Sequence, residues 1–122
     1  MIGRRDLNAY CLSLPGTVKQ YPFGEGAGVF KVLGKMFALV PDGDPLSISL
    51  KCDPMRAVML RDTYAAVTPA YHMNKRHWNG VAVDGSIPDD EVYELIDHSY
   101  DLVVASLPRR DRERLGREAS HD

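Results

Sequence analysis

Hydrophobic and polar positions recur along this chain with two different periods, which predict the order of its elements. Residues 6–14 carry apolar side chains at positions 7, 10, 11 and 14, the spacing of one helical face. Residues 27–33 and 35–40 are rich in β-branched and aromatic residues, and 46–51 alternate strictly between apolar and polar. These patterns predict a helix followed by three strands, with turns at Gly34 and at 42–45.

The second half of the chain predicts two more helices. Asp53 is a predicted N-cap with Pro54 in the first turn, and Met55, Val58 and Met59 form the predicted apolar side. Residues 64–80 are the least regular, with an extended segment expected around 70–74 and a strand over 78–83. A helix over 88–105 is predicted to turn six side chains inward: Val92, Leu95, Ile96, Ser99, Leu102 and Val103.

The resulting order is α-β-β-β-α-(β)-β-α. Short hairpin connections predict a mainly antiparallel sheet, and the helices must then cover one of its faces. We therefore expect an α+β fold, a two-layer sandwich formed by a single domain over residues 1–108. Residues 109–122 are polar, and we expect a flexible tail with no more than one helical turn.

Composition narrows the class of protein. The chain has 122 residues, of which 44% are hydrophobic and 26% charged, as in ordinary globular domains. Nothing approaches the ~20 apolar residues of a membrane span, and the first residues lack the apolar core of a signal peptide. We expect a soluble cytoplasmic protein, in which Cys11 and Cys52 are reduced thiols.

Charge is distributed unevenly around a net charge of −2. Residues 80–108 contain seven acidic residues and no Lys or Arg, whereas 1–79 contain ten Lys and Arg. This pattern argues against a globally cationic protein but is compatible with one basic and one acidic face. The simpler alternative is that one helix has an acidic solvent side.

The densest group of polar and aromatic side chains lies within 71–79. Lys75 and Arg76 can pair with phosphates, and Asn74 can hydrogen-bond a phosphate or a base edge. Tyr71 and Trp78 are candidate stacking platforms, with His72 and His77 as further donors. Alternatively, the two aromatic residues anchor the sheet and the cations occupy a solvated turn.

Catalytic and metal chemistry have weaker support. His72, His77 and His98 are metal-ligand types, but no pair has the close spacing of a metal motif. Cys11 lies on the predicted inward side of a helix, whereas Cys52 precedes a predicted helix and is a candidate for a lowered thiol pKa. We therefore expect no enzyme activity, no metal and no cofactor.

Several motifs in this order resemble the MmcQ/YjbR family of small bacterial proteins. They lie within residues 5–108, and the segment 71–78 is the most specific of them. In chain order these motifs are Leu14-Pro15-Gly16, Tyr21-Pro22-Phe23-Gly24, Val29-Phe30-Lys31-Val32, Gly34-Lys35-Met36-Phe37-Ala38, Lys51-Cys52-Asp53-Pro54, Thr68-Pro69-Ala70-Tyr71-His72-Met73-Asn74-Lys75-Arg76-His77-Trp78 and Asp97-His98-Ser99-Tyr100-Asp101-Leu102-Val103.

The resemblance implies an α-β(3)-α-β(2)-α fold, related to frataxin-like and secretion-chaperone-like architectures. It also implies DNA binding, with hairpins acting as wings that grip the duplex. In this chain the wings would be 31–35 and 70–83. The phosphate contacts implied by the resemblance are Lys31, Lys35, Lys51, Lys75 and Arg76.

Our leading hypothesis is a non-enzymatic module that binds DNA or another nucleic acid through its phosphate backbone. Its candidate residues are Lys31, Lys35, Lys51, His72, Asn74, Lys75, Arg76, His77 and Trp78. The alternative is a protein- or peptide-binding adaptor of secretion-chaperone-like architecture that uses an exposed sheet face or edge. A third hypothesis is a small enzyme or ligand binder using Cys52, His72 or His98. In each case we expect a monomer or a weak homodimer.

Overall fold

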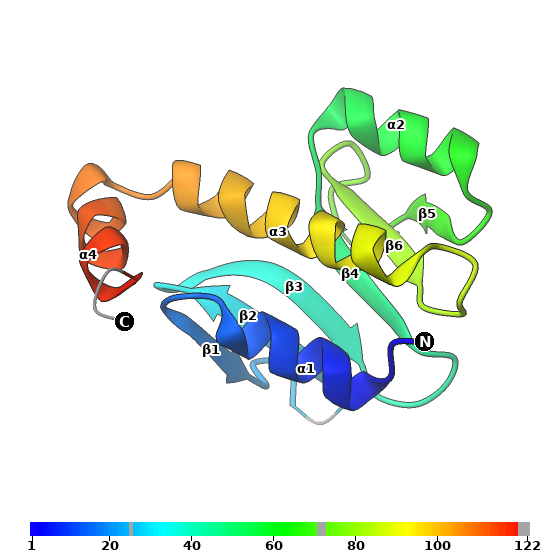
Figure 1. The fold of residues 1–122 in the computed structure, drawn as a ribbon, viewed down its shortest axis with the longest axis horizontal. Helices are drawn as coiled ribbons and strands as arrows, with labels where there is room; N and C mark the ends of the chain where they lie inside the picture. The colour runs from blue at the N-terminus through cyan, green and yellow to red at the C-terminus, as the bar shows by residue number, and fades with distance from the viewer. Residues whose placement is uncertain (25, 71–72, 120–122) are drawn as a thin grey trace.

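A computed structural model describes residues 1–24, 26–70 and 73–119 as one sheet with helices packed against it (Figure 1). Its elements in chain order are α1 (Arg4–Ser13), β1 (Thr17–Gln20), β2 (Ala27–Val32), β3 (Lys35–Pro41), β4 (Ser47–Lys51), α2 (Pro54–Thr63), β5 (Val67–Pro69), β6 (Trp78–Ala82), α3 (Asp89–Ala105) and α4 (Arg109–Ala119).

The sheet is antiparallel throughout, with the strand order β1-β2-β3-β4-β6-β5. Buried residues of α1, α2 and α3 belong to a single core cluster, so these helices lie on the same face of the sheet. No helix of the described residues covers the opposite face, which is here called the open face (Figure 1). The predicted α+β fold is confirmed.

The core follows from the two periods in the sequence. In β4, Ile48 and Leu50 are buried, and the residues that alternate with them, Ser47, Ser49 and Lys51, are half-buried. Of the six residues predicted to face inward on α3, five are buried and Leu102 is half-buried. Tyr100 was not predicted to be in the core, yet its ring packs edge-on against Phe37 at a centroid distance of 5.4 Å.

Helix α2 presents a different face to the core from the predicted one. Asp53 is the N-cap as expected, and its carboxylate accepts a hydrogen bond from the Arg56 amide at 3.2 Å. The buried residues, however, are Ala57 and Leu60, whereas Met55 and Met59 are 76% and 62% exposed. Small side chains such as Ala57 allow a helix to approach its neighbours closely, so docking at this end of the sheet overrides the apolar pattern.

Three segments are more regular than the sequence predicted. Thr17–Gln20 forms the edge strand β1, which pairs with β2, and Val67–Pro69 forms β5. The polar C-terminal segment forms α4 instead of a flexible tail, and its Leu115 is only 5% exposed.

A tight contact explains how α4 docks. The Leu115 Cδ2 atom would lie 2.5 Å from a Cβ at Gly16, whose φ is +75°. Glycine is therefore required at position 16 for both backbone conformation and space. Among residues 109–116 of α4, Leu115 is the only apolar side chain, so hydrophobic periodicity provides no signal for this helix.

Candidate nucleic-acid interface

Strand alternation places two of the predicted cations on the open face. Phe30 and Val32 are fully buried in the core, so Lys31 between them points to the opposite side. Lys51 follows the buried Leu50 in the same way and pairs across the sheet with Trp78. Directly opposed residues in an antiparallel pair share a face, so Lys51 and Trp78 are neighbours on the open face.

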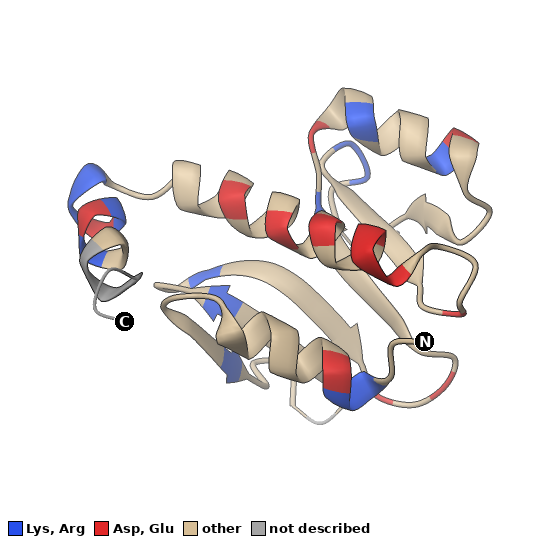
Figure 2. Ribbon diagram, in the orientation of Figure 1, with Lys and Arg blue, Asp and Glu red and all other residues tan. Residues whose placement is uncertain are grey.

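The antiparallel topology also brings all five predicted phosphate-binding cations to one end of the sheet. Strand β2 ends just after Lys31, β3 begins at Lys35, β4 ends at Lys51, and the loop carrying Lys75 and Arg76 leads into β6. These ends coincide because neighbouring strands run in opposite directions. We call this end the cationic end (Figure 2).

Two predicted residues of the β5–β6 loop have structural roles. Asn74 is exposed, but its side-chain oxygen accepts a hydrogen bond from the Arg76 amide at 3.0 Å. His77 is half-buried, and its carbonyl accepts a hydrogen bond from the Cys52 amide at 2.8 Å. The predicted contact His72 lies outside the described residues.

Arg61 of α2 holds this loop in place. Its Nη1 donates to the Lys75 carbonyl at 3.1 Å and to the Asn79 side-chain oxygen at 2.9 Å. Asn79 is only 2% exposed, and its amide nitrogen in turn donates to the Ala57 carbonyl. The loop that carries two of the cations is therefore fixed to the helical layer by a polar network that is buried at Asn79.

Acidic residues are concentrated on the helical layer, across the sheet from Lys31 and Lys51. Figure 2 shows them along α3, where they connect the neighbouring helices. Glu94 forms an ion pair with Arg56 of α2, and Asp97 accepts a hydrogen bond from the Tyr10 hydroxyl of α1 at 2.7 Å. The acidic block of the sequence thus lies on the helical layer, opposite the two lysines of the open face.

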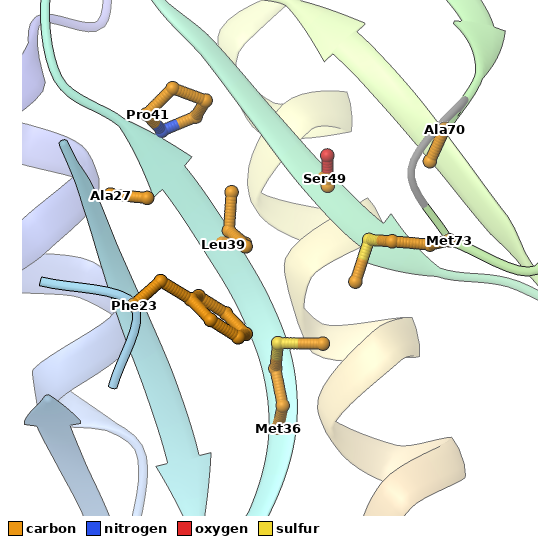
Figure 3. Close-up of a pocket in the computed structure, with 8 residues that line it drawn as sticks. All are labelled: Phe23, Ala27, Met36, Leu39, Pro41, Ser49, Ala70 and Met73. Carbon is orange, nitrogen blue, oxygen red and sulfur yellow. The ribbon is translucent and has the colours of Figure 1, made fainter. Parts of the chain in front are cut away.

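The open face also carries an apolar groove that the sequence analysis missed. Its volume is about 570 Å³, and all but one of the residues around it are apolar. Met36 and Leu39 of β3 lie in its floor, and Phe23 and Met73 reach it from two loops (Figure 3). One signal was available: Met36 to Val40 is a continuous apolar run, although a strand covered on one face should alternate.

Burial shifts the pKa of Cys11, Cys52 and His98 in the direction that favours the neutral form of each side chain. Burial raises the pKa of the Cys11 thiol to about 12. Burial also raises the pKa of Cys52 despite a lowering contribution from Arg56, so the expectation of a lowered pKa at this position was wrong. Burial lowers the pKa of His98, whose Nε2 accepts a hydrogen bond from the Asp53 amide.

Residues 1–24, 26–70 and 73–119 contain neither a metal-binding cluster nor a membrane-spanning helix. Within these ranges no three His, Cys, Asp or Glu residues are grouped closely enough to hold a metal ion. Within the same ranges, every helix is too short or too polar to cross a bilayer.

Comparison with known proteins identifies close relatives. The YjbR family model matches residues 12–102. The chain is 37% identical over 111 residues to the uncharacterized protein YjbR of Escherichia coli K12, covering 90% of this chain and 94% of that one. It is 39% identical over 106 residues to the uncharacterized protein YbdF of E. coli O157:H7, covering 85% and 86%.

A solved structure has a similar fold. The crystal structure of Deinococcus radiodurans protein DR2400 superimposes with a TM-score of 0.86 at 39% identity, covering 92% of this chain and 86% of that chain.

Proposed function

The chain belongs to the YjbR family, and from the charge arrangement on its sheet we propose a non-enzymatic module that binds nucleic acid through phosphates. The observation that carries the proposal is the gathering of five cations at one end of the sheet, two of them on its uncovered face. They come from four separate parts of the chain: Lys31, Lys35, Lys51 and the pair Lys75 and Arg76.

Phosphate binding fits this arrangement better than binding of a neutral ligand. A row of Lys and Arg side chains that neutralises several phosphates releases counterions, and this supplies affinity without reading sequence. The net charge of −2 does not oppose it, because the largest cluster of acidic side chains lies along α3 on the helical layer. A polyanion responds to the local face.

Salt dependence of DNA binding tests the proposal. We would titrate the protein with short duplex and single-stranded DNA at several salt concentrations and follow the anisotropy of a labelled strand. If all five cations engage phosphates, log K should fall with log salt with a slope of roughly −3 to −5. Absence of binding at ~50 mM salt, where polyanion binding is favoured, would refute the proposal.

Single substitutions make the test specific to the cationic end. Lys31→Ala and Lys51→Ala should each weaken binding and reduce the size of the salt slope by about 1. Arg5→Ala is the matched control, because Arg5 is an exposed cation on α1 in the helical layer. The control should leave the slope unchanged. An equal effect of all three variants would show that only net charge matters.

A second candidate, the protein-binding adaptor, is supported by the exposed face of α2. Met55 and Met59 border a groove of about 800 Å³ between α2 and the β5–β6 loop, which Arg61 and Arg76 also line. Exposed methionines suit adaptable apolar contacts, and the arginines favour an acidic segment of a partner.

The two candidate functions can be separated by one double variant. We would titrate the protein with a synthetic acidic amphipathic helical peptide and with a copy in which Lys replaces every acidic residue. The adaptor predicts binding of the acidic peptide alone and loss of that binding in Met55→Ser/Met59→Ser. The same variant should leave the DNA salt slope unchanged. Equal binding of both peptides contradicts the adaptor.

A further inference from the structure

The apolar groove and the cationic end are parts of one continuous surface. Lys31 is the cross-strand partner of Met36, which lies in the groove floor. Ser49 also borders the groove, and Lys51 follows it by two residues on the same face of β4, at about 7 Å. An occupant of the groove therefore has lysine side chains at its end.

The groove has the size and walls of a binding site for a flat apolar group. Its volume of about 570 Å³ lies within the range of small-molecule sites. Phe23 from the β1–β2 loop and Met73 from the β5–β6 loop reach it from opposite sides of the floor (Figure 3). Phe23 is 72% exposed, so its ring is available to a partner.

We propose that this groove receives unpaired bases of a single nucleic-acid strand whose phosphates lie against Lys31 and Lys51. The inference rests on the proposed function and names its ligand more closely. A base has a flat apolar face and is attached to a phosphate, which matches an apolar floor bordered by lysines. Stacking of bases on aromatic and apolar side chains beside a cationic track is a common mode of single-strand binding.

Duplex DNA fits this surface less well than a single strand. In a duplex the bases are stacked on one another, and only their edges are accessible in the grooves. Phosphates of a duplex can still reach the cationic end, but the apolar groove then stays in water. The single strand gains both contacts and should bind more tightly at the same salt concentration.

The test compares strands that differ only in their bases. One probe is an oligothymidylate of about 12 nucleotides, and the other is an abasic strand of equal length with tetrahydrofuran at every position. Both carry the same phosphates. One base placed on the groove should make the oligothymidylate bind roughly 5- to 100-fold more tightly, the range of base-stacking contributions. The corresponding duplex should bind like the abasic strand.

A substitution in the groove assigns this difference to the groove. Phe23→Ser should lower the affinity for oligothymidylate toward that for the abasic strand and leave the salt slope of both unchanged. Tyr21→Ser is the matched control, because Tyr21 is 49% exposed on the same loop and does not line the groove. It should preserve the preference for bases.

The outcomes separate this inference from the proposed function. Equal, salt-dependent binding of the oligothymidylate and abasic strands would refute the base site and leave phosphate binding intact. A preference that survives Phe23→Ser would also refute it. If none of the probes binds at ~50 mM salt, phosphate binding itself fails, and the base site fails with it.

Discussion

The hydroxyl of Ser99 joins α3 to two strands of the sheet, and its removal tests how the cationic end is held together. Ser99 is completely buried; its hydroxyl accepts a hydrogen bond from the Lys51 amide at 2.9 Å and donates one to the Phe37 carbonyl at 2.6 Å. The registered pairs of β3 and β4 are Ala38 with Leu50 and Leu39 with Ser49. The hydroxyl therefore bridges the two strands just beyond their ladder.

The expected loss of stability follows from the groups left unpaired. Ser99→Ala changes the side-chain volume little, so no sizeable cavity forms. It deprives a buried carbonyl and a part-buried amide of their partner, and an unpaired buried polar group costs about 1–3 kcal/mol. Because the amide is part-buried, we expect the free energy of unfolding to fall by about 2–4 kcal/mol in total.

Urea unfolding followed by circular dichroism measures this loss. Ser13→Ala is the control, since the exposed Ser13 hydroxyl bonds only the Tyr10 carbonyl within its own helix, and it should change stability by less than about 0.5 kcal/mol. Hydrogen exchange of the Lys51 amide should accelerate in Ser99→Ala alone. If both variants lose the same small amount, or if Lys51 exchange is unchanged, the reasoning is refuted.

Three further predictions concern the core and its titration. Because α2 buries Leu60 and exposes Met59, Leu60→Ala should lower the free energy of unfolding in urea by about 2–4 kcal/mol and Met59→Ala by less than about 0.5 kcal/mol. A larger loss in Met59→Ala than in Leu60→Ala would instead support the buried face predicted from the sequence. Leu115→Ala should cost about 2–4 kcal/mol in the same assay, whereas a flexible C-terminal segment would show no change. Burial raises the pKa of Cys11 from 9.0 to about 12. The free energy of unfolding should therefore be at its full value below pH 9 and fall as the pH rises toward 12, because the thiol of the unfolded chain loses its proton first. Tyr10, whose pKa is raised by burial and by its hydrogen bond to Asp97 from 10.0 to about 12, adds to the fall above pH 10. A free energy of unfolding that stays constant from pH 8 to pH 11 would contradict this prediction.

The elements that were predicted correctly pack against the core through apolar side chains at regular intervals in the sequence. Strand β4 alternates, and α3 repeats its apolar residues with the helical period, so their sequence contains the direction of the core. The order of the elements and the antiparallel sheet followed from the short connections between strands. Asp53 was found as an N-cap because its local hydrogen bond needs only the next helical turn.

The candidate site was only partly predictable. Residue type and family resemblance identified the five cations, and hairpin geometry places Lys31 near Lys35. The pairing of Lys51 with Trp78 joins β4 to β6, strands that are not consecutive in the chain, so only the folded sheet brings them together. The apolar groove depends likewise on loops from distant segments, which supply Phe23 and Met73.

By itself the sequence determined most of the local structure: the segments that form α1, α2, α3, β2, β3, β4 and β6, and which side of β4 and α3 is apolar. Tertiary structure decided which face of α2 is buried, that Leu115 docks beside Gly16, and that the cations lie next to the groove. The physical reason is the distance along the chain over which each interaction acts. Periodicity and capping act within one or two helical turns, whereas these features depend on contacts between residues far apart in the chain.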